Sequence, residues 1–233
     1  MGAGELILVG ITLAGLVGGA FLFWRYVWFF RDPPRTPPAE EGVLSPADGT
    51  VVYVQKAEPG EAVVVIKQGV RATVEDILRE HVDQPKLVIG IFMSPFDVHY
   101  NRAPLDGTVG FIHRHPAIGK NLNMGSMHWR TVLGRPPFYT DSVHIVQNAR
   151  TVTHFDAEYG GAALPLYVVQ IGARSVNGIE SYFREGGRVA RGATFGMIRI
   201  GSQVDLVVPW RADLVIRVQP GDKVRAGESI LIQ

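Results

Sequence analysis

The chain has 233 residues, enough for one catalytic domain with an appendage and for burial of a substantial core. It contains no cysteine, which excludes disulfides, thiolate metal sites and a cysteine nucleophile. Its 23 basic and 22 acidic residues nearly balance, so the overall charge does not indicate a nucleic-acid partner.

The N-terminal segment is the first predicted element. No charged residue lies between Glu5 and Arg25, a stretch about as long as a membrane span. A signal peptide is the alternative, but the basic residues follow the apolar run and the aromatic segment after it is a poor cleavage site. Arg25, Arg31 and Arg35 lie beyond the span, and the positive-inside rule then places the rest of the chain in the cytoplasm. We expect residues 1–30 to anchor the protein in the cell membrane.

A proline-rich segment follows and predicts a stiff linker over residues 31–42, so the catalytic domain is expected over residues 43–233. Short β-prone runs separated by glycine and proline then favour a mainly β sandwich or barrel. One helix is expected over Thr73 to His81, with Thr73 as its cap. The expected strands are Thr50 to Gln55, Ala62 to Ile66, Leu87 to Met93, Thr108 to Ile112, Ser142 to Val146, Leu166 to Ile171, Thr194 to Ile200, Val204 to Val208, Leu214 to Val218 and Ser229 to Ile232.

Two short patterns each occur twice. Residues 47–51 (ADGTV) are echoed at 105–109 (LDGTV), and residues 186–192 (GGRVARG) at 221–227 (GDKVRAG). The second pattern is similar to the hairpins of lipoyl and biotinyl domains, so a barrel-sandwich hybrid is the first choice of fold. This similarity leaves another class of function open, a non-catalytic, membrane-anchored adaptor or carrier domain. A carrier requires a modifiable lysine at a hairpin tip, and Lys223 lies instead inside the turn pattern.

The pair Gly201-Ser202 lies between two apolar runs near the C-terminus. A strand-turn-strand arrangement would hold the serine hydroxyl beside the carbonyl of Gly201, and glycine tolerates the backbone angles of such a turn. The hydroxyl could then attack its own backbone. Gly-Ser is also a common turn dipeptide and recurs at Gly125-Ser126, so the pair alone is a weak signal.

Three further motifs strengthen that signal: residues 29–35 (FFRDPPR), 45–49 (SPADG) and 93–104 (MSPFDVHYNRAP). With residues 195–202 (FGMIRIGS) they agree in order and spacing with one family. On these four motifs the chain resembles the short form of the phosphatidylserine decarboxylase proenzymes, including the archaetidylserine decarboxylase-like members. The resemblance covers most of the chain from Arg31 onward.

The resemblance implies a phospholipid-synthesising lyase that cuts itself between Gly201 and Ser202, giving a β chain of residues 1–201 and an α chain of residues 202–233. In this family the serine attacks the preceding carbonyl, and β-elimination with hydrolysis leaves a pyruvoyl group, the cofactor that Ser202 would become. Its ketone condenses with the amine of a serine-headgroup phospholipid and accepts the electrons released with CO2. The implied product of phosphatidylserine is phosphatidylethanolamine, and archaetidylserine stays an alternative substrate.

The resemblance also implies roles for single residues. Asp48 matches the aspartate of an Asp-His-Ser arrangement, and His99 matches the proton donor in decarboxylation. Asp48 has an alternative role as an Asp-Gly turn residue. Many relatives carry a second histidine where this chain has Arg102, so the base that activates Ser202 stays open. His99 remains a candidate for this role, as do five other histidines: His113, His115, His128, His144 and His154.

A second departure from the family is Ala149, which stands where relatives commonly have glutamate in Asn-Glu-Arg. No metal site is predicted. The expected partners are the membrane, the lipid substrate and the two chains of the precursor, without nucleic acid. Homo-oligomerisation stays open.

Overall fold

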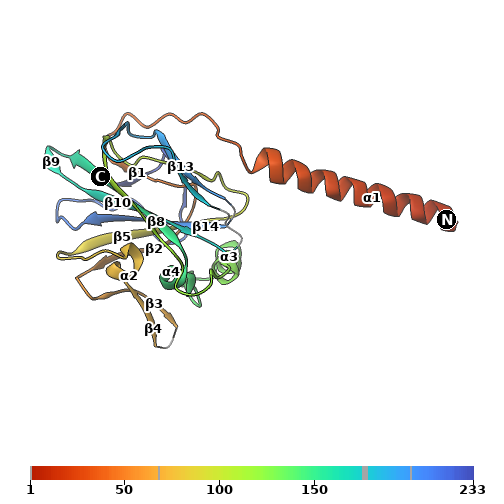
Figure 1. The fold of residues 1–233 in the computed structure, drawn as a ribbon, viewed down its shortest axis with the longest axis horizontal. Coiled ribbons are helices and arrows are strands. Elements are labelled where there is room, and N and C mark those ends of the chain that lie inside the picture. The colour runs from red at the N-terminus through yellow and green to blue at the C-terminus, as the bar shows by residue number, and fades with distance from the viewer. Residues whose placement is uncertain (1, 68, 175–177, 200) are drawn as a thin grey trace. The chain divides into compact units, whose positions relative to one another are not determined.

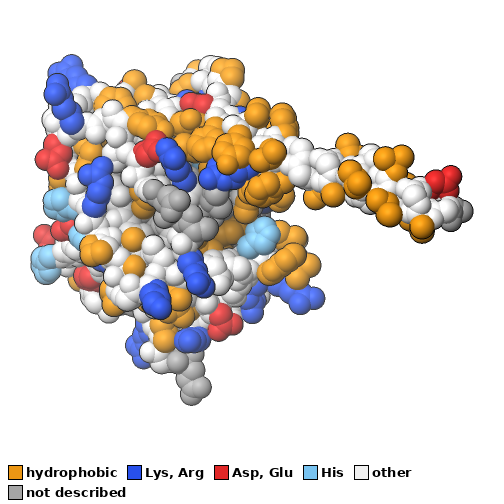
Figure 2. Space-filling model, turned by 45° about the vertical axis from the view of Figure 1, so that its right-hand side comes forward, with side chains coloured by type: hydrophobic (Ala, Val, Ile, Leu, Met, Phe, Trp, Pro, Cys, Tyr) orange, Lys and Arg blue, Asp and Glu red, His pale blue; other side chains and the backbone are white. Residues whose placement is uncertain are grey.

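The computed structural model describes residues 2–67, 69–174, 178–199 and 201–233. The chain is divided into two compact units, residues 1–33 and residues 34–233. The first unit contains helix α1 (Ala3–Phe23), which continues into the π-helical turn η1 (Trp24–Trp28). Residues 3–28 form a helix long and apolar enough to cross a membrane, and hydrophobic side chains line its surface (Figure 2). The expected apolar N-terminal helix is confirmed.

The second unit is mainly β, as predicted. Its largest sheet, counted over the described residues, has nine antiparallel strands that curl into a half-barrel (Figure 1). Eight of them follow the order β12-β7-β8-β10-β14-β5-β2-β15, and β9 pairs with β8. The strands are β2 (Gly49–Ala57), β5 (Lys86–Met93), β7 (Gly107–His115), β8 (Arg150–Tyr159), β9 (Ala162–Ala163), β10 (Leu166–Gly172), β12 (Arg188–Val189), β14 (Ser202–Pro209) and β15 (Lys223–Val224).

Smaller elements cover both faces of this sheet. One face packs on β1 (Val43–Leu44), β16 (Ile230–Ile232) and a three-stranded sheet of β6 (Tyr100–Arg102), β11 (Ile179–Ser181) and β13 (Thr194–Ile198). The other face packs on the hairpin β3 (Ala62–Lys67) with β4 (Val70–Thr73), and on α2 (Val74–Leu78), α3 (Gly125–Val132) and α4 (His144–Gln147). Two hydrophobic cores result, and alternate residues of each central strand point to one or the other.

The sequence echoes correspond to a structural repeat at the two ends of the main sheet. In the first copy, residues 221–227 pair with β2, and in the second copy, residues 186–192 pair with β7. The registers match, since Val224 lies opposite Gly49 and Val189 lies opposite Gly107. A Cβ atom would lie 2.2 Å from a carbonyl oxygen at Gly49 and 2.5 Å from one at Gly107, so both copies require glycine there.

Some expected elements differ in the structure. The strand expected over Ser142 to Val146 is wrong: a helical turn, α4, forms there because the amide of Asn148 donates back to the carbonyl of His144. Leu214 to Val218 contributes only an isolated bridge to the last strand. The helix expected to reach His81 ends at Leu78, followed by a left-handed residue. The end of the strand expected over Thr194 to Ile200 lies outside the described residues.

Candidate active site

Three of the sequence motifs meet through direct contacts. The carbonyl of Pro46 accepts hydrogen bonds from the amide of Arg102 at 3.0 Å and from the side chain of Asn101 at 3.3 Å. The sulfur of Met93 lies 3.4 Å from the hydroxyl of Ser202 and 3.9 Å from the Asn101 amide nitrogen. The segments that precede β2, surround β6 and begin β14 therefore form one site.

Gly201 and Ser202 lie where a turn enters the central strand β14. Ser202 is fully buried and has Gly172 of β10 on one side and Met93 of β5 on the other. Gly201 has φ of +64°, in the left-handed region that favours glycine. Its carbonyl oxygen accepts a hydrogen bond from the backbone amide of Ala173 at 3.1 Å. This amide polarises the carbonyl next to the serine and can stabilise negative charge on its oxygen.

The Ser202 hydroxyl itself is weakly held. It lies 3.4 Å from the thioether sulfur of Met93, which is a weak acceptor. Hydrogen bonds to the strands on both sides fix the backbone of Ser202. Rotation of the hydroxyl away from Met93 breaks only a weak contact. This combination suits a hydroxyl that must turn toward a neighbouring carbonyl.

His99 follows a tight turn that Asp97 closes. The Asp97 carboxylate accepts from the amide of Ser94 at 2.7 Å, and the turn leads directly to the buried His99. Nδ1 of His99 lies 2.9 Å from the Asp97 carbonyl oxygen, which only accepts, so Nδ1 carries the proton. Nε2 is then the nitrogen that can take up and return a proton. The carbonyl of His99 accepts from the amide of Ile198, which ties it to the strand just before Gly201.

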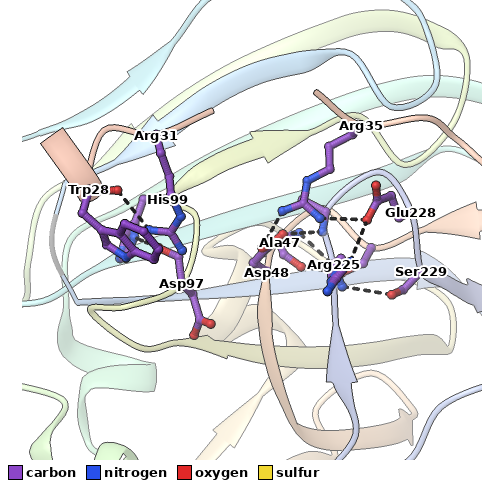
Figure 3. Close-up of polar contacts among 12 residues, drawn as sticks. Trp28, Arg31, Arg35, Ala47, Asp48, Asp97, His99, Arg225, Glu228 and Ser229 are labelled. Atoms are coloured by element: carbon purple, nitrogen blue, oxygen red, sulfur yellow. Dashed lines mark hydrogen bonds and ion pairs between the residues drawn. The ribbon is translucent and has the colours of Figure 1, made fainter. Parts of the chain in front are cut away.

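Asp48 is held by a backbone amide and by a cation, Arg35, which Figure 3 shows beside it. Its carboxylate accepts from Arg35 at 2.8 Å and from the amide of Ala226 at 2.7 Å, so the structure pairs it with these groups rather than with His99. Arg35 also binds Glu228 at 2.8 Å. Burial raises the pKa of Asp48 above its ordinary value, while the Ala226 amide and Arg35 oppose the increase.

Arg102, where the family resemblance implies a second histidine, is buried and donates to the carbonyl of Gly192 at 3.1 Å. A guanidinium offers N–H donors and no acceptor, so it cannot replace that histidine as a base. The side chain instead fixes the loop before β13.

A buried polar network lies on the opposite face of β14. Gln203 donates to the Tyr53 hydroxyl and to Asp205, each at 2.7 Å, and its amide oxygen lies 3.0 Å from Nε2 of His144. Tyr53 also donates to Asp205 at 2.8 Å. Burial raises the pKa of Asp205 to about 6 and lowers the pKa of His144 to about 4. His144 is therefore neutral at pH 7, and it lies across the sheet from the hydroxyl of Ser202.

The Asn148-Ala149-Arg150 segment braces the loop that follows β10. The Asn148 side chain donates to Leu122 at 2.9 Å and to Gly172 at 2.8 Å. Arg150 is buried and donates to backbone carbonyls of α2. Ala149 contributes backbone contacts, among them a bond from the amide of Gly172 to its carbonyl.

A cavity of about 480 Å³ reaches strand β10, which pairs with β14. Gly172, the strand neighbour of Ser202, lines it together with Arg114, Thr151 and Ile179. Arg114 is exposed and brings a positive charge to this cavity. The cavity is therefore suited to an anionic headgroup.

One group of residues has the composition of a metal site. Ligand atoms of Glu80, His113 and His115 lie within 4.8 Å of one another. His113 Nδ1 is 2.6 Å from the Glu80 carboxylate, a hydrogen bond that satisfies both groups without an ion. His154 stacks on Phe111, whose ring also stacks on His113.

Sequence reasoning missed the residues that support the reactive pair from other strands. Ala173 acts through its backbone amide, which no residue type signals. Gln170 donates to Asn101 at 2.8 Å in the buried interior, and only its polarity within a β-prone run marks it. Met93 and Asn101 lie inside a motif that was recognised, but neither was assigned a role.

Comparison with known proteins identifies similar sequences over nearly the whole chain. A family described as "Phosphatidylserine decarboxylase" matches residues 22–232. A Methanopyrus kandleri protein named "Putative archaetidylserine decarboxylase proenzyme" is 37% identical over 209 residues, covering 88% of this chain and 80% of the relative. Two further relatives are named "Phosphatidylserine decarboxylase proenzyme". The Geotalea uraniireducens protein is 34% identical, covering 98% of this chain and 90% of its own; the Symbiobacterium thermophilum protein is 33% identical, covering 97% and 85%.

Proposed function

Because the chain belongs to the phosphatidylserine decarboxylase family, a family of carboxy-lyases, we propose that it cuts itself at Gly201-Ser202 and converts phosphatidylserine to phosphatidylethanolamine and CO2. The observation that carries the proposal is the Ala173 amide bound to the Gly201 carbonyl, directly before a buried serine on a central strand. Archaetidylserine is the second candidate substrate, because the relative that is 37% identical bears that name.

Self-cleavage begins at the Ser202 hydroxyl. Its oxygen adds to the Gly201 carbonyl carbon, and the Ala173 amide stabilises the charge that develops on the carbonyl oxygen. The C–N bond then breaks, the nitrogen takes a proton and an ester remains. Loss of the Ser202 α-proton breaks the Cβ–O bond and frees the Gly201 carboxylate. Water then supplies the ketone oxygen, and the nitrogen of residue 202 leaves as ammonia. A pyruvoyl group remains at residue 202.

The pyruvoyl group supplies a carbonyl that takes up the electrons released when the substrate carboxylate leaves as CO2. The buried position of Ser202 fits this group, because the surrounding strands exclude water. Nδ1 of His99 keeps its proton on the Asp97 carbonyl, so Nε2 takes up a second proton to give the imidazolium and then delivers that proton to the substrate carbon. Arg114 binds the anionic headgroup in the adjoining cavity.

Asp48 assists self-cleavage through its negative charge, since it lies two residues after Pro46, whose carbonyl binds Asn101 and the amide of Arg102. His99 and Asp48 are the candidates for the base that removes the Ser202 proton. The apolar helix α1 anchors the protein with its catalytic domain in the cytoplasm, as the basic residues beyond α1 indicate.

The test compares the two Gly-Ser pairs of the chain. Ser202→Ala is expected to give one uncut chain, whereas Ser126→Ala, the matched control, is expected to give chains of residues 1–201 and 202–233 by intact mass. Only the cut proteins should release CO2 from phosphatidylserine, with archaetidylserine assayed in parallel. Cleavage of Ser202→Ala at the same bond would overturn the proposal, as would an uncut parent protein without activity on either lipid.

A further inference from the structure

Helix α3 presents an apolar face to the surroundings. Trp129, Val132 and Leu133, at helical spacing i, i+3 and i+4, are 62%, 60% and 55% exposed. Met124 and Met127, on the inward side, are buried in the core. A surface helix of a soluble protein usually turns polar residues outward, so three adjacent apolar side chains on one face mark an interaction surface.

This surface lies at the Ser202 end of the sheet. The ring of His128 on α3 lies 6.1 Å from that of Phe92, which pairs with Gln203, the neighbour of Ser202. The loop before α3 is also fixed to the site, because the amide of Arg174 donates to the carbonyl of Leu122 at 3.0 Å. A partner bound to α3 would therefore border the reaction site.

The segment that contains α3 is mainly basic, and its nearest acidic residue along the chain is the exposed Asp141, which follows Thr140, a contact of Ser126 on α3. Residues 107–140 contain no aspartate or glutamate. Arg130 donates to the carbonyls of Arg135 and Pro137, which holds the loop after α3 against the helix, and Arg135 is exposed. Figure 2, which brings the right-hand side of Figure 1 forward, shows basic and hydrophobic side chains next to one another.

We propose that α3 and residues 133–135 insert into the surface of a bilayer that contains anionic serine phospholipid, which brings the Ser202 cavity to its substrate. The inference rests on the proposed function, because it takes the membrane lipid as substrate. A tryptophan with aliphatic neighbours suits the headgroup boundary, and nearby arginines attract anionic headgroups. A second copy of the chain fits less well, since two basic surfaces repel each other.

The docking test uses the absence of native cysteine. In the full chain reconstituted in vesicles, Val132→Cys and Val215→Cys each carry one environment-sensitive fluorophore. Val215 is the matched control: it is 54% exposed and pairs with the C-terminal residue, which Figure 1 shows at the other end of the domain from α3. Brominated serine phospholipid should quench the label at 132 at least several-fold more than the label at 215. Equal quenching, or excimer formation by a pyrene at 132 without lipid quenching, would overturn the proposal.

A second measurement separates docking from chemistry. A variant combining Trp129→Ser, Val132→Ser and Leu133→Ser should raise the apparent KM for vesicle lipid several-fold, with kcat and turnover of a dispersed short-chain serine phospholipid unchanged. Normal self-cleavage of the variant reports its folding. Equal losses on both substrates would contradict docking. Failure of the parent protein on both substrates would instead overturn the proposed function, while the fluorophores still decide whether α3 contacts lipid.

Discussion

Asp48 and Asp106 occupy the same position in the two copies of the structural repeat. Each precedes a glycine at the start of a long strand, and each carboxylate accepts a backbone amide from the paired turn: Ala226 at 2.7 Å for Asp48 and Arg191 at 2.9 Å for Asp106. Asp106 is exposed, whereas Asp48 is buried and also binds Arg35. The turn alone therefore accounts for an aspartate in both copies, but not for burial of the first.

Burial of a carboxylate costs free energy, which appears here as the raised pKa of Asp48. Since Asp106 closes the same turn while exposed, the turn does not require that cost. In the first copy the buried charge lies in the segment that contacts Asn101 of β6. Asn101 in turn contacts Met93, the neighbour of Ser202. This difference supports a role for Asp48 beyond the turn.

A large effect on self-cleavage is expected from matched substitutions in the two copies. Asp48→Asn keeps an oxygen for the Ala226 amide but removes the charge, and we expect self-cleavage to slow about 100-fold or more. Asp106→Asn should process at the parental rate. Time courses on denaturing gels measure both. Equal rates for the two variants would break the comparison and leave Asp48 as a turn residue only.

His99→Ala determines which step needs the histidine. Without its proton donor, lipid turnover should fall by about 100-fold to 10,000-fold. His154→Ala, in a half-buried site away from the motifs, is the control. A cut but inactive His99→Ala protein would place the base for Ser202 elsewhere, with Asp48 as the candidate. An uncut protein would support one histidine in both steps. Full decarboxylation by this variant would refute the assignment.

The strands between the two copies give a prediction about stability. Asp205, with a pKa of about 6, stabilises the fold when protonated, and its contribution falls as pH rises from about 4 to 6. His144, with a pKa of about 4, contributes stability that rises with pH from about 4 to 6.5. The two slopes oppose each other. In Asp205→Asn only the contribution of His144 remains. The free energy of unfolding should then rise with pH by roughly 3 kcal/mol in total, as expected for a pKa shift of this size.

Urea unfolding of the detergent-solubilised protein at several pH values measures this slope. The exposed Asp156→Asn is the matched control and should keep the parental profile. A profile for Asp205→Asn that is as flat as that of the parent would show that the buried pair does not titrate in this range.

The smallest expected effect concerns the second copy, whose strand β7 carries Arg114. If this copy contributes binding rather than chemistry, Arg114→Gln should raise the KM for serine phospholipid several-fold with kcat unchanged. Arg71→Gln, an exposed arginine on the β3–β4 hairpin, is the control. Steady-state kinetics measure both variants. A loss confined to kcat would place Arg114 in the chemical step and remove this distinction between the copies.

Much of the fold could be predicted because many of its strands are either alternating apolar and polar residues or continuous apolar runs, and glycine or proline separates them. β8 could not, since Thr151 and Thr153 on it are polar yet buried, and hydrophobic pattern does not report burial of polar residues. The β-branched residues around α4 suggested a strand, but tertiary contacts of Asn148 favoured a helical turn.

The candidate site was predictable where residue type carries the chemistry, as at Ser202 and His99. It was not predictable where the backbone does, as at the Ala173 amide. The pairing of Asp48 with Arg35 was also missed, although both lie in recognised motifs, because sequence spacing does not give the direction of a side chain.

The central place of β14 also has a kinetic consequence. From Ser202 to Pro209 each residue has a partner on β5, and the strand also pairs with β10. A chain cut between Gly201 and Ser202 would keep its fragments together through these ladders, yet once unfolded it could refold only when two separate molecules meet. Maturation would thus turn a concentration-independent folding reaction into a bimolecular one, and the working life of the enzyme would depend on how slowly it unfolds.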